Sequence, residues 1–201
     1  MATEIELKAW VSEPDALRER LDGLARGAGS FEKEDSYWYD PAGRLSASGI
    51  RIRKETDRNP QGEDARRVLV TYKQKETRDG VEVNDEHEFL VSCDRPFEEL
   101  LIRLGFVRGS CKHKRGWSWD YAGITVELAC VEGLGWFVEL EILSDSPAQE
   151  EVCAAKSRLR EALETIGVGQ DKIEPRYYTE LLLHQWIDGQ PAGQPPADAV
   201  P

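Results

Sequence analysis

Charged and apolar side chains alternate in the first segment of the chain, which reads Glu4-Ile5-Glu6-Leu7-Lys8. Side chains two residues apart share one face of a β-strand, so the three charged residues would lie on one side and the two apolar residues on the other. Two carboxylates and an ammonium group in a row can hold a divalent cation and a phosphate together. This segment therefore predicts a site for metal-assisted phosphate chemistry.

The same alternation returns in six further segments and includes both signs of charge. The basic members of this charged stripe are Lys8, Arg51, Arg53, Lys73, Lys75, Lys112 and Lys114. Its acidic members are Glu4, Glu6, Glu86, Glu88, Glu127, Glu139 and Glu141. Lysine and arginine bind phosphate oxygens, whereas clustered glutamates bind Mg²⁺ or Mn²⁺. Because so many cations exceed what a monophosphate needs, the charged stripe favours a polyanion such as a triphosphate.

Two arrangements of the charged stripe fit the alternation. In an open antiparallel sheet with one wet face, the charges would form ordinary surface pairs that contribute little each. In a closed barrel with the charges inside, they would have to pair or bind a ligand, because an unpaired buried charge is costly. Amphipathic helices could then cover the apolar faces from outside. In such a lumen, replacing Arg53 by alanine should abolish triphosphate binding with little loss of stability.

Eight segments have strand-like alternation or a high content of β-branched and aromatic residues, and most are joined by short turns. They cover residues 3–11, 34–40, 47–55, 66–76, 83–92, 107–120, 123–131 and 136–143. Four helices are expected, and they begin with Ser12 as an N-cap, at Asp94, at Ser146 and near Tyr177. Eight strands with short connections favour an antiparallel sheet or barrel.

The chain of 201 residues carries a formal net charge of −12, which argues against a nucleic-acid binder or a peripheral membrane protein, since both usually present basic surface. Neither a signal peptide nor a membrane-spanning run is apparent, so a cytoplasmic protein is expected. Residues 188–201 are rich in Pro, Gly, Ala and Gln and are expected to be disordered, which leaves one domain over residues 1–187. Four widely spaced cysteines predict reduced thiols that pack like small apolar groups: Cys93, Cys111, Cys130 and Cys153.

Seven motifs resemble the CYTH domain, the triphosphate tunnel metalloenzyme superfamily, in the right order over residues 3 to about 184. They are Glu4-x-Glu6-x-Lys8, Asp35-Ser36-Tyr37-Trp38-Tyr39-Asp40, Gly49-Ile50-Arg51-Ile52-Arg53, Leu69-Val70-Thr71-Tyr72-Lys73, Lys112-x-Lys114-x-x-Trp117, Val131-Glu132-Gly133-Leu134-Gly135 with Phe137-Val138-Glu139-Leu140-Glu141, and Tyr178-Thr179-Glu180-Leu181-Leu182. Two positions depart from the family's pattern. Ala129 stands where the family often has aspartate, and Lys114 replaces an arginine.

The resemblance implies an α+β, mainly β fold: an eight-stranded antiparallel closed barrel, the triphosphate tunnel, with helices packed outside. It implies Mg²⁺ or Mn²⁺ as cofactor, held by Glu4, Glu6, Glu139 and Glu141, with Glu127 replacing the carboxylate that is missing at Ala129. The phosphate-binding residues would be Lys8, Arg51, Arg53, Lys73, Lys112 and Lys114, joined by Lys75 from the charged stripe. Glu86 and Glu88 would be additional lumen acids, and Lys8 and Glu6 would take part in catalysis.

Three activities stay open at this point. The expected one is metal-dependent hydrolysis of inorganic tripolyphosphate or of an organic triphosphate such as thiamine triphosphate. The alternatives are a class IV-type adenylyl cyclase, which converts ATP to cyclic AMP and pyrophosphate, and a non-catalytic polyphosphate-binding protein. In each case the partner is a triphosphate-bearing small molecule rather than a nucleic acid or a membrane, and the resemblance is compatible with a homodimer.

Overall fold

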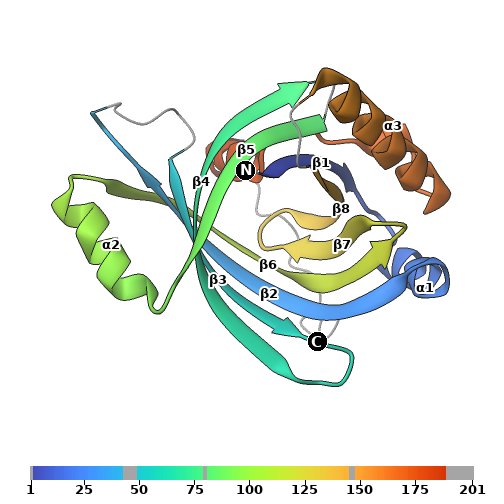
Figure 1. Ribbon diagram of the computed structural model, residues 1–201, viewed down its shortest axis with the longest axis horizontal. Helices are drawn as coiled ribbons and strands as arrows, with labels where there is room; N and C mark the ends of the chain where they lie inside the picture. The colour runs from blue at the N-terminus through green and yellow to red at the C-terminus, as the bar shows by residue number, and fades with distance from the viewer. Residues whose placement is uncertain (1, 43–48, 79–80, 145–147, 189–201) are drawn as a thin grey trace.

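The computed structural model describes residues 2–42, 49–78, 81–144 and 148–188, and the side chains of residues 2, 73–78, 85–86 and 184–188 lie outside that description. Within these ranges the chain forms eight strands and four α-helices (Figure 1). No helix in the described ranges is long and apolar enough to cross a membrane.

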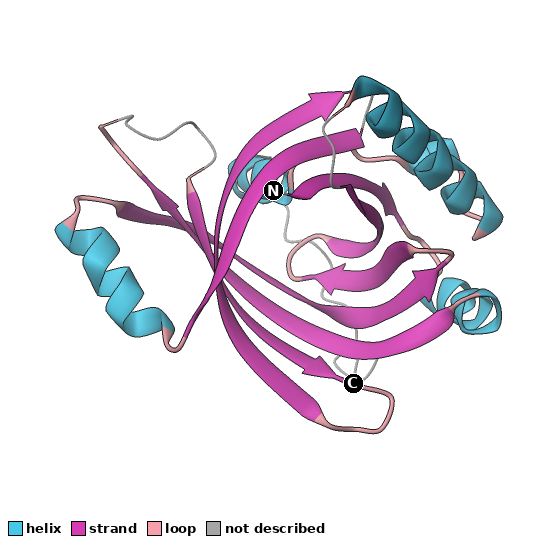
Figure 2. Cartoon of the chain, viewed as in Figure 1, coloured by secondary structure: helices cyan, strands magenta, loops and turns pink. Residues whose placement is uncertain are grey.

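The eight strands form one closed antiparallel barrel, in the order β1-β5-β4-β3-β2-β6-β7-β8. Pairing of β8 with β1 closes the ring. The strand bounds are β1 Ala2–Trp10, β2 Arg26–Tyr39, β3 Ile50–Arg58, β4 Asp64–Arg78, β5 Val81–Val91, β6 Val107–Tyr121, β7 Ile124–Val131 and β8 Gly135–Ser144. The predicted fold class is therefore confirmed, and Figure 2 shows α1, α2 and α3 lying outside the curved sheet.

The apolar face of the strands points outward and is covered by two helices, α1 (Pro14–Leu24) and α3 (Gln149–Thr165). In β1, Ile5 and Leu7 are fully buried in this outer core, together with Leu21 of α1 and Leu159 of α3. Since alternate residues of a strand point to opposite faces, burying Ile5 and Leu7 outside the barrel turns the charged residues of β1 inward. The outer core thus sets which residues face the lumen.

Of the two further helices, α2 covers another part of the wall and α4 begins at the lumen. Helix α2 (Asp94–Arg103) buries Leu101 against Trp38, Ile52 and Val70 on β2, β3 and β4. Helix α4 (Tyr178–Asp188) follows a short 3₁₀ turn, Gln170–Lys172, and packs Tyr178 and Leu181 against an apolar cluster around Phe137. The first residues of α4 are thereby held at the barrel.

Helix ends differ in part from the sequence-based expectation. Glu13, not Ser12, occupies the N-cap position of α1, and it makes no side-chain capping bond. At the end of α2, Gly105 has a positive φ of 87°, and the Phe106 N–H donates to the Leu101 carbonyl at 2.9 Å, as expected for a glycine-terminated helix. Ser146 and the tail 189–201 lie outside the described residues.

The cysteines are free thiols, as predicted, but most of them do not pack in the core. Cys130 is buried, whereas Cys93, Cys111 and Cys153 are exposed. The prediction of packing cysteines therefore holds for Cys130 alone, because Cys111 on β6, Cys153 on α3 and Cys93 before α2 face solvent.

Candidate active site

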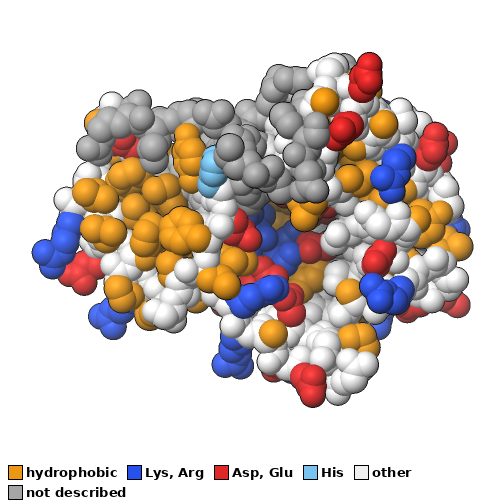
Figure 3. Space-filling model, in the orientation of Figure 1, with side chains coloured by type: hydrophobic (Ala, Val, Ile, Leu, Met, Phe, Trp, Pro, Cys, Tyr) orange, Lys and Arg blue, Asp and Glu red, His pale blue; other side chains and the backbone are white. Residues whose placement is uncertain are grey.

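The lumen of the barrel contains a cavity of about 430 Å³, and all eight strands contribute side chains to it. Figure 3 shows the hollow, with acidic and basic side chains inside it. The charged residues that line it are Glu4, Glu6, Lys33, Arg51, Arg53, Glu82, Glu88, Lys112, Lys114, Glu127, Glu139 and Glu141. Of the two arrangements that the alternation allowed, the structure therefore has the one with the charges inside.

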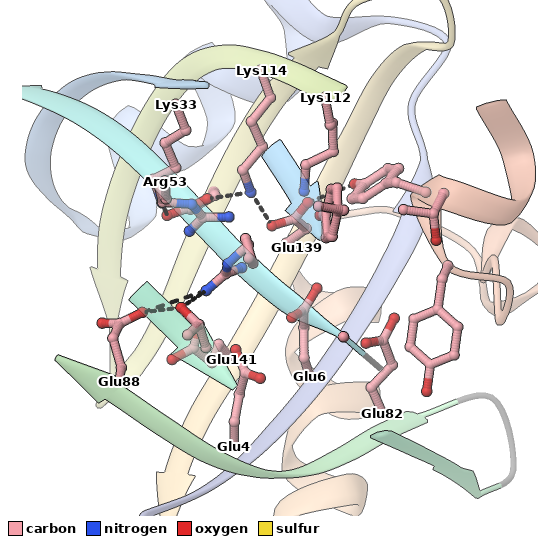
Figure 4. A pocket seen from close by; sticks show the side chains of 18 of the residues that line it. Glu4, Glu6, Lys33, Arg53, Glu82, Glu88, Lys112, Lys114, Glu139 and Glu141 are labelled. Atoms are coloured by element: carbon pink, nitrogen blue, oxygen red, sulfur yellow. Dashed lines mark hydrogen bonds and ion pairs between the residues drawn. The ribbon is translucent and has the colours of Figure 1, made fainter. Parts of the chain in front are cut away.

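The cations and the carboxylates of the lining come from different sets of neighbouring strands, and Glu139 reaches Lys114 of β6 (Figure 4). The described cations of the lining come from β3, β2 and β6, which are neighbours in the ring. The carboxylates of the lining come from β7, β8, β1 and β5, which are also neighbours. We call these the basic half and the acidic half. A ligand in this cavity would meet donors for an anion on one side and oxygen ligands for a metal ion on the other.

Asp35 organises the basic half. Its carboxylate, which is not exposed at all, accepts hydrogen bonds from Arg53 Nε and Nη2 at 2.7 and 3.0 Å and lies 3.1 Å from Lys112 Nζ. Burial by itself would raise the pKa of Asp35, but Arg53 and Lys112 hold it well below its ordinary value. Burial also lowers the pKa of Lys112 to about 8, against the opposing attraction of Asp35.

A chain of ion pairs connects the two halves. Glu127 lies 2.5 Å from Lys33 Nζ and 2.9 Å from Lys114 Nζ, and Lys114 also contacts Glu139 at 2.5 Å. Glu127 and Glu139 stand directly opposite each other on β7 and β8, where like charges repel, and Lys114 bridges them. The hydroxyl of Tyr178 donates to the second oxygen of Glu139 at 2.6 Å. Burial opposes ionisation of Glu139, but Lys114 lowers the pKa of this carboxyl overall.

Strand register brings three carboxylates into one row in the acidic half. Glu6 of β1 stands opposite Glu82 of β5 on one side and opposite Glu141 of β8 on the other. Glu4, two residues along, accepts a hydrogen bond from Asn84 Nδ2 at 3.1 Å. Adjacent like charges on one face are unfavourable without a cation nearby.

The donor chemistry of this row suits a hard divalent cation, because Mg²⁺ and Mn²⁺ prefer carboxylate oxygens. The described residues contain no group of three acidic, histidine or cysteine side chains already gathered as a metal site. Glu127 and Glu139, two of the predicted metal ligands, instead bind Lys33 and Lys114. Glu4, Glu6 and Glu141, with Glu82, form a row of neighbouring carboxylates that supplies such oxygens.

Most of the predicted site residues line one cavity. They are Glu4, Glu6, Arg51, Arg53, Glu88, Lys112, Lys114, Glu127, Glu139 and Glu141. Lys8 is adjacent but is not among the described lining residues: it is buried, contacts Glu82 at 2.5 Å, and its ammonium lies 5.4 Å from the ring centre of Tyr178. The side chains of Lys73, Lys75 and Glu86 lie outside the described residues, although the register pairs Lys73 with Glu86.

Sequence reasoning missed several residues of the site. Lys33 and Glu82 each fall one residue before the start of a predicted strand, so the alternation was not extended to them. Asp35 and Tyr178 belong to recognised motifs but were given no role. Extending the alternation of β2 backwards from Tyr37 through Asp35 would have placed Lys33 on the same face.

Comparisons with known proteins agree with this architecture. The model of the CYTH domain family matches residues 2–178, and no curated protein matches the sequence significantly. The PH1819 protein of Pyrococcus horikoshii OT3 is 30% identical, with a TM-score of 0.76 over 90% of this chain and 99% of that one. A candidate adenylate cyclase of Vibrio parahaemolyticus is 19% identical, with a TM-score of 0.72 over 90% and 97% of the two chains.

A third protein has the same fold at lower sequence identity. HpAC1 of Hippeastrum, a candidate adenylyl cyclase described as having a dominant triphosphatase activity, is 16% identical, with a TM-score of 0.61 over 92% and 96% of the two chains. Since the family model spans most of this chain, and the barrel with its charged lumen is the architecture that the resemblance implied, the chain belongs to the CYTH domain family.

Proposed function

We propose that this protein hydrolyses a triphosphate, inorganic or organic, inside its barrel with the help of a divalent cation. The observation that carries the proposal is the division of one cavity into a basic half and an acidic half. A triphosphate is a polyanion that binds divalent cations. Its phosphate groups would therefore complement the basic half, and the bound cation would complement the acidic half.

The basic half would bind and orient the phosphate groups. Arg51 and Arg53 offer planar guanidinium groups that can contact two phosphate oxygens at once, and Lys112 offers a point charge. Phosphoryl transfer depends mainly on positioning and on neutralising charge, so cations fixed by buried partners are well suited to it. Arg53 is fixed in this way by Asp35.

The acidic half would hold the cation. Glu4, Glu6 and Glu141, with Glu82 beside them, are the residues whose oxygens suit Mg²⁺ or Mn²⁺. A bound divalent cation would neutralise charge on the phosphate oxygens and help to align a water molecule with the terminal phosphorus. Lys8, which contacts Glu82, would balance the charge of that carboxylate. The catalytic role expected for Lys8 stays a prediction.

Hydrolysis is the activity to test first because HpAC1, which shares the fold, is described as having a dominant triphosphatase activity. Cyclisation of ATP would need a pocket that recognises adenine. The aromatic residues of the described lining are Tyr37, Tyr177 and Tyr178. Tyr177, just before α4, and Tyr178, its first residue, already lie with their ring centres 5.7 and 5.4 Å from the ammonium of buried Lys8. Adenylyl cyclase activity and simple polyphosphate binding are therefore alternative outcomes of the test.

The test is one set of assays with tripolyphosphate, ATP and thiamine triphosphate, each with Mg²⁺ or Mn²⁺ and with EDTA, and with products separated by ion-exchange chromatography. Orthophosphate that forms only with metal supports the proposal. Cyclic AMP and pyrophosphate from ATP would establish the cyclase, and binding without turnover would establish the binding protein.

A matched pair of variants links the activity to the lumen. Glu6→Gln removes one carboxylate from the acidic half, whereas Glu34→Gln removes one from the outer face of β2, where it pairs with exposed Lys54. We expect Glu6→Gln to lose most of the turnover and Glu34→Gln to keep it. Equal activity of the two variants would show that the reaction takes place elsewhere.

A further inference from the structure

Apolar side chains gather at the end of the molecule that carries α2. Figure 3 shows this area at the left, where Figure 1 places α2 and the adjoining ends of β5 and β6. On one flank of α2, Leu100 and Leu104 are 48% and 52% exposed, and Phe89 of β5 is 51% exposed. Phe89 meets half-buried Phe97 of α2 edge to face, with 6.1 Å between the ring centres. We call Phe89, Phe97, Leu100 and Leu104 the α2 patch.

The α2 patch adjoins the apolar contact that attaches the helix to the barrel. Leu101, which is 2% exposed, is the buried α2 residue of that contact with β2, β3 and β4, and Phe97 packs against its edge. Leu100 and Leu104 are one helical turn apart, and Phe97 lies three residues before Leu100, so the three share a flank. Single exposed leucines need no explanation, whereas a contiguous apolar area usually marks an interaction site.

The charges around the α2 patch differ from those of the rest of the chain. Residues 89–108 contain three acidic residues and three basic ones, so this segment is neutral in a chain of net charge −12. The acidic ones are Asp94, Glu98 and Glu99, and the basic ones are Arg95, Arg103 and Arg108. Two copies of the chain would therefore meet at this face without the repulsion that the remaining surface would cause.

The arrangement of opposite charges beside the α2 patch also favours self-association. Glu99 and Arg103 lie next to Leu100 and Leu104 along the helix and pair with each other at 2.7 Å, and both are largely exposed. In a contact with two-fold symmetry, every contact occurs twice, so if Glu99 of one copy meets Arg103 of the other, Arg103 of the first also meets Glu99 of the second. An apolar centre beside charges of both signs is the usual composition of such an interface.

We propose that the α2 patch is the contact surface between two copies of this chain, which associate with two-fold symmetry. An anionic lipid surface is a poorer partner, because the chain is acidic overall and the segment around the patch has no excess of basic residues. The proposal concerns the wall of the barrel opposite α1, and it does not depend on the reaction in the lumen.

Sedimentation equilibrium of the whole chain, with vesicle flotation as a second arm, tests the proposal. Leu100→Glu introduces a charge into the α2 patch, and Leu24→Glu introduces the same charge at the end of α1, where the leucine is 47% exposed. We expect the unmodified chain and Leu24→Glu to be dimers and Leu100→Glu to be a monomer with an unchanged circular dichroism spectrum. A chain that stays monomeric up to about 100 µM, above the range expected for an interface of standard size, would overturn the proposal. So would a Leu100→Glu dimer, or a monomer that floats with vesicles.

Two charge-reversal variants give a second test, whose positive result cannot come from misfolding of either variant. Arg103→Glu and Glu99→Arg each place like charges on both sides of the two-fold contact, so each variant alone should be a monomer. A mixture of the two should restore a dimer that contains one copy of each, as native mass spectrometry would show. Failure of the mixture to associate, while the unmodified chain is a dimer, would overturn the assignment to this flank of α2.

Discussion

The carboxylate of Asp35 lies fully buried between two cations, and Arg53 contacts both of its oxygens. Removing one partner of a buried pair costs about 3–5 kcal/mol when the other charge is left uncompensated, and Arg53→Ala leaves Asp35 with Lys112 alone. We therefore expect Arg53→Ala to lower the free energy of unfolding by up to about that amount, as well as to abolish triphosphate binding. This revises the expectation from the sequence, in which Arg53 contacted only the ligand and the loss of stability was small.

Urea unfolding of two variants measures this effect. Arg26→Ala removes an arginine from an exposed pair with Asp120 and should cost less than about 1 kcal/mol. If Arg53→Ala unfolds at the same urea concentration as Arg26→Ala, the buried pair is not what holds the basic half in place.

Lys112 should make triphosphate binding depend on pH in the mildly alkaline range. Burial lowers its pKa to about 8 from 10.5, so it loses its charge as the pH rises through 8. At pH 9 about nine-tenths of the molecules would lack this cation, which should weaken binding by about tenfold if the charged form is required. Titration calorimetry with a triphosphate at pH 7 and pH 9 measures the change, and Lys112→Met should not show it.

The stability of the protein should change in the opposite direction over the same range. Between about pH 8 and 10.5 the unfolded chain keeps a proton on Lys112 that the folded chain has lost, so the free energy of unfolding should rise with pH. The difference between the unmodified protein and Lys112→Met isolates this contribution from other groups. A difference that falls as the pH rises would contradict the assigned direction of the pKa.

Helix α4 is fixed at its start by one buried carboxylate. Glu174 accepts hydrogen bonds from Trp10 Nε1 at 3.0 Å and from Arg176 Nε and Nη2 at 2.8 and 2.7 Å, and its N–H donates to the Lys8 carbonyl at 2.9 Å. Arg176 lowers the pKa of Glu174 to about 2, so the pair is charged at neutral pH. These contacts place Tyr178, whose hydroxyl holds Glu139, at the edge of the cavity.

Glu174→Gln keeps the shape of this anchor and removes its charge. We expect a loss of about 1–2 kcal/mol in the free energy of unfolding and a several-fold fall in kcat, because Tyr178 would hold Glu139 less firmly. Tyr178→Phe should reproduce the fall in kcat with the anchor intact. Asp64→Asn, which weakens an exposed pair with Arg58 far from α4, is the control and should change neither quantity. Normal kcat in both Glu174→Gln and Tyr178→Phe would show that the start of α4 does not position the site.

Strand alternation predicted all eight strands and the face on which the charged stripe lies, because a period of two assigns side chains to faces directly. It did not fix where a strand begins, which is why Lys33 and Glu82 were missed by one residue each. Ser12 was a reasonable N-cap by residue type, but α1 begins at Pro14 and Glu13 takes the cap position. Local pattern thus gives the elements, while their ends depend on packing.

At the scale of the whole molecule, alternation could not distinguish an open sheet from a closed barrel, since both place the charged stripe on one face. The difference lies in long-range pairing, in which β1 joins β8 and β5. That pairing also creates the acidic half, because it brings Glu6 beside Glu82 and Glu141, which are far away in the chain. The ion pairs of Glu127 and Glu139 with Lys33 and Lys114 likewise depend on the three-dimensional fold. The sequence pattern gave no indication of them.

The balance of charge in the lumen leads to a prediction about ligand binding. The described lining contains seven carboxylates and five cations, so these residues alone carry a net charge of −2. A triphosphate without metal would meet the acidic half as well as the basic half, whereas a divalent cation converts the acidic half into an attractive surface. We therefore expect tripolyphosphate to stabilise the protein strongly only when Mg²⁺ or Mn²⁺ is present.

Thermal unfolding with and without metal tests this expectation. A ligand at 100 times its Kd stabilises by about 2.7 kcal/mol, which corresponds to a rise in Tm of about 5–10 °C for a chain of this size. With tripolyphosphate and Mn²⁺ we expect a rise of that order, and with tripolyphosphate and EDTA a much smaller one. Glu6→Gln should reduce the metal-dependent part of the rise, whereas Glu34→Gln should leave it unchanged. An equal rise with EDTA would mean that the basic half binds the anion by itself, and that the carboxylates across the lumen have no part in holding it.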